Sequence, residues 1–302
     1  MLKKIFILFK LGRKLARSDI LTILSKFKKP PLAIKILFQI LSFSFSPPNK
    51  NNLNENEGAK LSKSLQSMGT TFIKLGQFLV TRPDIIGDDL AKQLEGLQDR
   101  LPAFTLTEAK AIIKKDLGDD TFNSIIDLSE PVAAASIAQV HKAKINDNGT
   151  IKDVAIKILR PDIKKVFNEE IDALMLFAFM VESFIKKTKR LKLVEVVFLL
   201  KEITNLEMDL RFEAAAANEY AENTKNDAGF RVPAIYWNFT SENVMTLDWV
   251  DGVSIRETED LQKRNIDTKR IASDVIQHFL RHAVRDGFFH ADMHQGNIFI
   301  DD

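Results

Sequence analysis

The sequence of 302 residues predicts an α+β fold built in two lobes. Residues 57–128 repeat apolar side chains at helical spacing, and from about residue 130 the spacing changes to the short runs of strands. Helical spacing returns after Pro161. Strands followed by helices are typical of an α+β domain. With 45% hydrophobic and 28% charged residues, the composition is that of a globular protein and excludes wholesale disorder.

Residues 1–46 form a basic, apolar arm that we expect to be an amphipathic helix, with Asp19 as its single acid. Such a helix binds an anionic membrane surface or packs on the protein's own body. Ile, Leu and Phe interleaved with Lys favour lipid over nucleic acid, so no nucleic-acid partner is expected. No apolar run reaches the ~20 residues that span a bilayer, and no export cleavage site follows the start. The sequence therefore predicts a peripheral protein at the cytoplasmic face of a membrane.

Helices and strands can be assigned after the linker around Pro47 and Pro48. We expect helices at residues 59–68, 71–79, 88–98, 107–116, 161–176, 192–221 and 268–286. We expect strands at residues 132–140, 153–159, 232–237, 243–250 and 298–300. Thr107 is the predicted N-cap of its helix. The stretch from Asn146 to Gly149 predicts a hairpin turn between the first two strands.

The most specific motif is His290-Ala291-Asp292-Met293-His294-Gln295-Gly296-Asn297. Protein kinases place H-x-D-x-x-x-x-N between a helix and a short strand, as here. Asp292 would accept a hydroxyl proton and Asn297 would bind magnesium. The spacing of His290 and His294 also allows a metal site on a helix, although Gly296 argues against a helix. A purely structural loop is the third interpretation.

Two upstream segments fit the same chemistry less specifically. Val154-Ala155-Ile156-Lys157 is the kind of strand whose lysine contacts nucleotide phosphates in kinases, although apolar strands ending in lysine are common. The small-residue segment Ala133-Ala134-Ala135-Ser136 lies where a glycine-rich phosphate loop would precede that strand. It contains no glycine, and alanine adopts positive φ only with difficulty. The alternative is a tightly packed strand of small residues.

Five motifs, in order, resemble those of the UbiB family of atypical kinase-like proteins, which is tied to ubiquinone (coenzyme Q) biosynthesis. They are Lys74-Leu75-Gly76-Gln77, Ala133–His141, Val154–Lys157, Glu207-Met208-Asp209 and His290–Asn297. The resemblance covers residues 57–302. It implies a protein-kinase-like fold that binds ATP and magnesium, with a helical extension in front. It also implies partners among ubiquinone-biosynthesis enzymes or lipid precursors beside a membrane.

The resemblance implies a domain order and a role for each matching residue. The order is the basic arm at 1–46, the helical extension at 57–128, a kinase-like N-lobe with a helical insertion at 129–250, and a partial C-lobe at 251–302. The implied contacts are Lys157, Ala133, Ala134, Ala135 and Ser136 with ATP, Glu213 with Lys157, Glu207 and Asp209 with Lys74 and Gln77 as a regulatory motif, Asp292 as base, and Asn297 with magnesium. By sequence distance alone, Glu169 and Glu182 are also candidate partners of Lys157.

The family pattern continues to an Asp-x-Gly that binds magnesium, whereas this sequence ends at Asp301-Asp302. We therefore expect a fragment of an atypical kinase or ATPase that binds nucleotide but turns it over poorly by itself. The alternative is a non-catalytic, membrane-associated scaffold or a decayed remnant of such a protein.

Overall fold

The computed structural model describes residues 57–94, 97, 101–184, 186–291, 293 and 296–301. The predicted basic arm at 1–46 lies outside these residues. The chain divides into two compact units. The helical unit contains the described residues up to Ala103, together with Ala134–Gln139 and Leu159–Met208. The sheet unit contains Phe104–Ala133, Val140–Ile158 and the chain from Asp209 onward.

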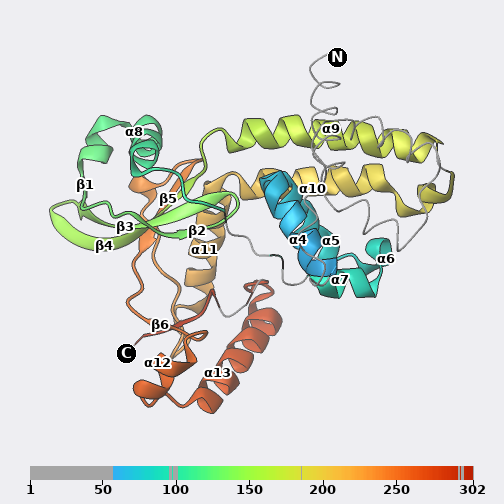
Figure 1. The fold of residues 1–302 in the computed structure, drawn as a ribbon. Coiled ribbons are helices and arrows are strands. Elements are labelled where there is room, and N and C mark those ends of the chain that lie inside the picture. Colours follow the sequence, from blue (N-terminus) through green and yellow to red (C-terminus); the bar gives the residue numbers. More distant parts are fainter. Residues whose placement is uncertain are drawn as a thin grey trace. The chain divides into compact units, whose positions relative to one another are not determined.

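The helical unit is built around two long neighbouring helices (Figure 1). Its elements are α4 (Glu57–Met68), α5 (Thr70–Val80), α6 (Pro83–Ile86), α7 (Asp88–Leu94), α9 (Ile163–Phe184), the 3-10 helix η1 (Lys186–Leu191) and α10 (Leu193–Glu207). Helices α9 and α10 pack along each other, and α5 contacts α4, α7, α9 and α10. The four helices predicted within this unit are all present. In the described part of the chain, no helix combines the length and apolarity needed to cross a bilayer.

Helix α5 carries the first of the family motifs and is fixed by close packing. Phe72 and Ile73 are buried on it. Gly76 lies where α5 passes its neighbours, because a Cβ added there would lie 2.5 Å from Leu97 Cδ2 and 2.9 Å from Leu65 Cδ1. The glycine of the Lys-x-Gly-Gln motif thus allows close helix packing.

The sheet unit has an antiparallel sheet with the strand order β1-β3-β4-β5, to which β2 adds by pairing with β3. The strands are β1 (Ile125–Ile126), β2 (Pro131–Ala134), β3 (Ala138–Asp147), β4 (Thr150–Leu159) and β5 (Val244–Asp248). Its core joins helix α8 (Leu106–Asn123) to the sheet. Ile113 of α8, Ile145 of β3 and Ile156 of β4 are fully buried in this core.

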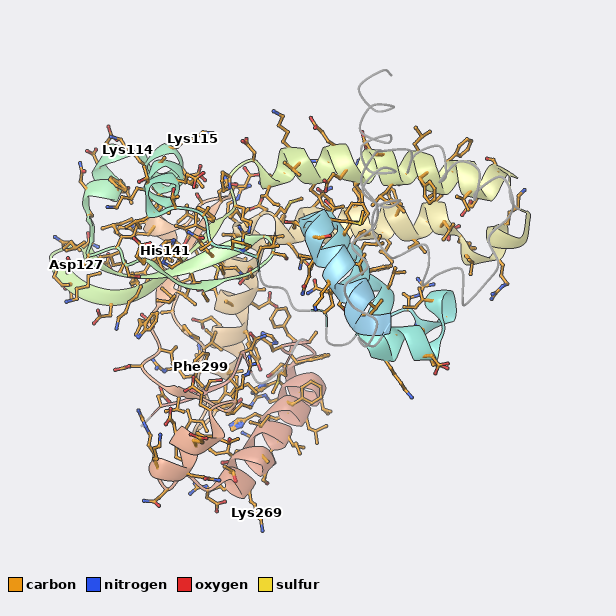
Figure 2. All side chains as sticks on the ribbon, in the orientation of Figure 1. Lys114, Lys115, Asp127, His141, Lys269 and Phe299 are labelled. Carbon is orange, nitrogen blue, oxygen red and sulfur yellow. The ribbon has the colours of Figure 1, made fainter. Side chains whose placement is uncertain are left out.

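The β3–β4 hairpin confirms the turn predicted from the sequence. Asn148 and Gly149 connect the strands, with φ values of 52° and 89°. Positive φ at both central residues is the requirement of the tight hairpin turn that Asn-Gly favours. The Asn146 side chain accepts a hydrogen bond from the Gly149 N–H at 2.8 Å. His141, part of the second family motif, is buried within β3 (Figure 2).

Four local predictions were wrong. The helix expected at 192–221 is two helices, α10 and α11 (Leu210–Thr224), because the chain leaves the helical conformation at Met208 and Asp209. Helix α8 is capped by Thr105 instead of Thr107, through a reciprocal capping box with Glu108. The strand expected at 132–140 is two strands, β2 and β3, separated at Ala135–Ile137. Residues 232–237 form only an isolated bridge, Ile235 with Leu247, before a 3-10 helix, η2 (Trp237–Phe239).

The C-terminal part of the sheet unit contains β6 (Val253–Ser254), α12 (Thr258–Lys263), α13 (Thr268–Arg281), a π-helical turn η3 (His282–Asp286) and β7 (Phe299–Ile300). Helix α13 and η3 together span the predicted helix at 268–286. Strands β6 and β7 pair antiparallel, and Figure 2 labels Phe299 there. Gly252 allows this pairing, because a Cβ at that position would lie 2.8 Å from the Ile300 carbonyl oxygen.

Candidate functional site

Lys157 and Glu213 form an ion pair within the sheet unit, as predicted. The Lys157 ammonium donates to both carboxylate oxygens of Glu213, at 2.6 and 2.7 Å. Lys157 lies on β4 between the buried Ile156 and Ile158, so strand alternation directs it away from the α8 core. Glu213 lies in the first turn of α11 (Leu210–Thr224). The pairing is therefore confirmed, whereas the nucleotide contact of Lys157 stays a prediction.

Both partners of this pair keep access to solvent. The Lys157 side chain is 26% exposed and the Glu213 side chain 47%. Exposed ion pairs contribute only about 0–1 kcal/mol to folding, because water screens them and two long side chains lose freedom. The pair therefore does more to orient a cationic group than to hold β4 and α11 together.

A buried cluster lies at the other end of α11. Asp227 accepts hydrogen bonds from Arg285 at 2.7 and 2.9 Å. His282 is fully buried, and its Nε2 lies 2.9 Å from Asp227 while its Nδ1 lies 2.7 Å from the hydroxyl of Tyr220 on α11. Phe230 packs edge-on against both Tyr220 and His282. The cluster thus joins α11 to α13 and η3.

The charges in this cluster shift the titration of its members. Hydrogen bonds from Arg285 and then from His282, against the opposing effect of burial, hold the pKa of Asp227 well below its usual range. Burial lowers the pKa of His278 on α13, and the charges of His282 and Arg281 lower it further. Burial raises the pKa of Tyr220, opposed by a hydrogen bond with the backbone of His290. The folded protein therefore favours the anionic form of Asp227 and the neutral form of His278.

The cluster leads directly into the His290–Asn297 segment. Beyond it, the chain is tied by a hydrogen bond from the Ile255 N–H to the Ile298 carbonyl at 3.1 Å, next to the β6–β7 pairing. Asn297 therefore lies at the entrance to a fixed strand. Asp292 and His294 lie outside the described residues, so the roles of Asp292 as base and of Asn297 as magnesium ligand stay predictions. Asp301 pairs with Arg231 at 2.6 Å.

The Ala-rich segment is held by its carbonyl groups, within the helical unit. Arg160 donates to the Ala135 carbonyl at 2.7 Å through Nη2 and at 3.1 Å through Nε. The same guanidinium donates to the Pro102 carbonyl at 2.8 Å. The Thr70 hydroxyl donates to the Ser136 carbonyl at 3.0 Å. Residues 133–136 all have negative φ, so the segment does not use the backbone conformations of a glycine-rich loop.

The proposed regulatory motif is partly assembled inside the helical unit. Lys74 on α5 forms an ion pair with Glu207 at the end of α10, at 2.7 Å. The Lys74 side chain is only 15% exposed, and pairing with Glu207 offsets the cost of burying its ammonium. Gln77 lies on the following turn of α5. Asp209 caps α11 by accepting from the Arg211 N–H at 3.1 Å, and it pairs with the Arg211 guanidinium at 2.7 Å.

Sequence reasoning did not find the Asp227 cluster. His278, His282 and Arg285 fall on one predicted amphipathic helix, but a histidine on a helix face gives no signal of burial. The i, i+4 spacing of His278 and His282 and the π-helical turn at 282–286 could have marked the region, since π-turns recur at functional sites. Asp227 follows α11 in a polar turn and had no feature that set it apart.

Comparison with known proteins assigns the family. Residues 96–302 match the family described as ABC1 atypical kinase-like domain. The chain is 36% identical over 272 residues to the probable protein kinase UbiB of Marinobacter nauticus, covering 90% of this chain and 48% of that protein. It is 38% identical over 250 residues to the probable protein kinase UbiB of Glaesserella parasuis, covering 82% of this chain and 46% of that protein.

The chain thus spans about half the length of the curated relatives it matches. A solved structure of a Mycobacterium tuberculosis protein in complex with erythromycin is also similar, with 26% identity and a TM-score of 0.46 over 80% of this chain and 60% of that one. The family match covers most of the sequence, including β4, α11 and the segment before β7. The chain belongs to the ABC1 atypical kinase-like family and is of the UbiB type.

Proposed function

We propose that this protein binds ATP with magnesium and acts as a UbiB-type atypical kinase or ATPase that supports ubiquinone biosynthesis at a membrane surface. The observation that carries the nucleotide part is the Lys157–Glu213 ion pair. Both carboxylate oxygens of Glu213 hold the Lys157 ammonium in one position. The lysine side chain nevertheless stays partly exposed, so an anionic ligand can reach it.

The chemistry of the pair suits a nucleotide phosphate. The two hydrogen bonds to Glu213 restrict where the Lys157 ammonium can lie. An ammonium has three N–H donors. The two carboxylate oxygens of Glu213 accept hydrogen bonds from the Lys157 ammonium, and a further N–H can donate to a phosphate oxygen. From the family motif alone, Ala133, Ala134, Ala135 and Ser136 are also proposed as nucleotide contacts.

Asn297 is the residue that would hold magnesium. Its amide oxygen is a hard donor, the kind that this ion prefers. When bound, magnesium neutralises charge on the phosphates. Asp292 is proposed to accept the proton of an attacking hydroxyl or water, and Asn297, placed before the fixed β7 strand, would keep its amide oxygen in one position.

The test is a titration with a fluorescent ATP analogue in the presence of magnesium. Lys157→Gln should weaken binding by about tenfold or more, because a charge-assisted hydrogen bond is lost. Lys152→Gln is the matched control, since Lys152 lies on the same strand and pairs with Asp147. Equal affinity for the wild type and Lys157→Gln would contradict the proposal. Magnesium-dependent hydrolysis abolished by Asp292→Asn would then separate an enzyme from a nucleotide-binding scaffold.

The membrane part rests on the basic, apolar arm at residues 1–46. Binding to vesicles should rise with anionic lipid content and weaken with salt. Flotation of the protein with residues 1–46 deleted measures the contribution of the arm. Unchanged flotation would show that the arm is not the anchor.

A further inference from the structure

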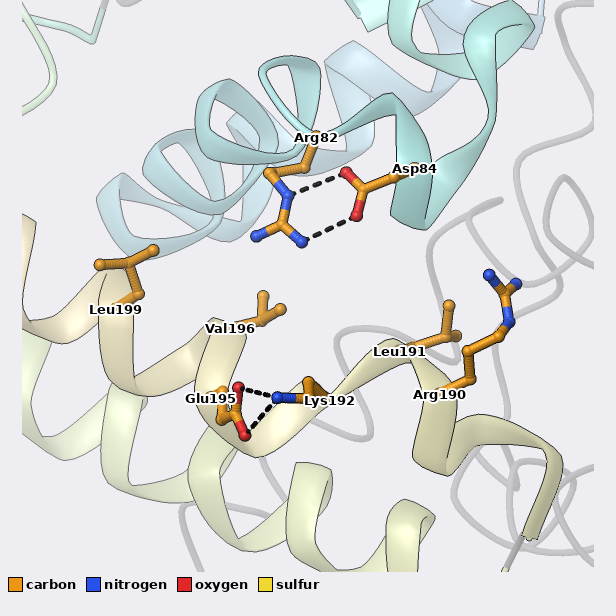
Figure 3. A pocket seen from close by; sticks show the side chains of 8 residues that line it. All are labelled: Arg82, Asp84, Arg190, Leu191, Lys192, Glu195, Val196 and Leu199. Atoms are coloured by element: carbon orange, nitrogen blue, oxygen red, sulfur yellow. Dashed lines mark hydrogen bonds and ion pairs between the residues drawn. The ribbon is translucent and has the colours of Figure 1, made fainter.

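A small open pocket lies within the helical unit, between the end of α5 and the start of α10 (Figure 3). Its volume is about 190 Å³. Eight residues line it: Arg82, Asp84, Arg190, Leu191, Lys192, Glu195, Val196 and Leu199. The pocket is lined by the helical unit alone, and the proposed nucleotide chemistry does not use it.

Among the charged residues that line the pocket, one cation, Arg190, is outside the close ion pairs. Arg82 and Asp84 form a bidentate pair with two contacts of 2.8 Å. Lys192 pairs with both oxygens of Glu195, at 2.9 and 3.0 Å. Arg190 forms no ion pair within 4.0 Å among the described residues, although its charge contributes, after Arg82, to lowering the pKa of Asp84. Figure 3 shows the Arg190 guanidinium away from the Lys192–Glu195 pair. The pocket therefore has an excess of positive charge.

Two further features raise the positive potential there. The pocket is lined by the first turn of α10, whose N-cap, Lys192, makes no side-chain cap hydrogen bond. Helix N-termini carry a partial positive charge. The segment from Lys186 to Lys192 contains five Lys and Arg residues, which adds to the field.

The remaining wall is apolar. Val196 is buried, 6% exposed, and Leu199 is 43% exposed at the opening. Phe198, the neighbour of Leu199 on α10, is 56% exposed. An inorganic ion gains nothing from contact with an apolar surface, whereas the hydrocarbon chain of an amphiphile would bury it. A volume of about 190 Å³ is below the ~300–1,000 Å³ of sites that enclose a whole small molecule.

We propose that this pocket binds the phosphate-class headgroup of an anionic amphiphile, with Arg190 as the principal ligand and Leu199 in contact with the start of the apolar chain. Arg82 supplies a second fork of donors when the anion competes with Asp84 for it, since guanidinium groups bind phosphate in a bidentate manner. A lipid headgroup and a free phosphate share this chemistry, and the apolar wall favours the lipid. The inference does not depend on nucleotide binding elsewhere in the chain.

The experiment uses three soluble probes with the full chain: inorganic phosphate, dihexanoyl phosphatidic acid below its micellar concentration, and dihexanoyl phosphatidylcholine. Calorimetry or NMR titration should show phosphatidic acid binding more tightly than phosphate, with no saturable binding of the zwitterionic lipid. Arg190→Gln should weaken phosphatidic acid binding by about tenfold. Leu199→Ser should weaken binding of phosphatidic acid and leave phosphate binding unchanged.

Lys189→Gln is the matched control, because it removes the same charge from an adjacent exposed residue that does not line the pocket. Its affinity should stay close to that of the wild type, and Arg190→Lys should restore part of the loss. Equal weakening by Arg190→Gln and Lys189→Gln would overturn the proposal in favour of diffuse attraction. Absence of phosphatidic acid binding, or equal affinity for phosphate and phosphatidic acid, would also overturn it.

Discussion

Two charged sites contact the same helix, α11, and differ in burial. At its first turn, Glu213 pairs with Lys157 in contact with solvent. Towards its other end, Tyr220 joins a buried cluster in which Asp227 is held by His282 and Arg285. Buried charges must be paired to be tolerated, whereas exposed pairs contribute little. We infer that the buried cluster holds α11 in place. Glu213 on this helix then orients the Lys157 ammonium toward solvent.

The largest effect is expected at Asp227. Asp227→Ala would leave His282 without its acceptor and would remove a carboxylate from Arg285, at the junction of α11, α13 and η3. The free energy of unfolding should fall by about 3–5 kcal/mol, as for other broken buried charge pairs. Denaturant unfolding measures it, and Asp227→Asn, which keeps the shape, should lose less. If Asp227→Ala lowers the free energy of unfolding by no more than the loss of an exposed ion pair does, the buried cluster does not stabilise the fold more than the Lys157–Glu213 pair.

An intermediate effect is expected at Lys74 and Glu207. The Lys74 side chain is 15% exposed and that of Glu207 is 37% exposed, so this pair lies between the two sites of α11 in burial. Glu207→Gln should lower the free energy of unfolding by about 1–3 kcal/mol, since it leaves a largely buried ammonium without its counter-charge. Lys192→Gln, in an exposed pair of the same unit, is the control. Equal losses in the two variants would show that burial does not set the contribution.

The pH dependence of stability should reveal His278. Burial lowers the pKa of His278 in the folded protein, so below about pH 6.5 the unfolded chain takes up a proton that the folded chain excludes. The free energy of unfolding should therefore decrease as the pH falls through 6.5, by up to about 1.4 kcal/mol per pH unit. His278→Phe keeps a buried ring and should flatten this dependence. An identical pH profile in the variant would assign the effect elsewhere.

The smallest effect on stability is expected at the exposed pair. Glu213→Gln should change the free energy of unfolding by no more than about 1 kcal/mol. Its effect should appear in ligand affinity, because the Lys157 ammonium loses the carboxylate that orients it. A destabilisation comparable to that of Asp227→Ala would mean that the pair is primarily structural.

The sequence was most informative where local chemistry decides the structure. The Asn148-Gly149 turn follows from the positive φ that a tight hairpin needs, and the helix at 268–286 follows from its amphipathic spacing. The strand expected at 232–237 failed because Pro233 has no N–H to donate. In addition, the Asp248 side chain accepts the Ala234 N–H at 3.0 Å, so side-chain pairing replaces part of the ladder.

The site was predictable to the extent that a motif carried it. Lys157 and Glu213 are 56 residues apart, and only the family resemblance selected Glu213 over Glu169 and Glu182. The residues of the Asp227 cluster are separated by similar numbers of residues along the sequence, but they belong to no motif that could have linked them. They become partners through the packing of α11 on α13 and η3, and neither periodicity nor composition encodes that contact.

The central claim, that the Lys157–Glu213 pair serves a ligand more than the fold, is tested most directly by one double-mutant cycle read in two ways. Wild type, Lys157→Gln, Glu213→Gln and the double variant are each measured for unfolding free energy and for affinity toward magnesium–ATP. We predict a coupling energy within about 1 kcal/mol in unfolding. In affinity, we predict that the double variant is no weaker than Lys157→Gln alone. A large coupling in unfolding, with nucleotide affinity unchanged in all three variants, would contradict the account.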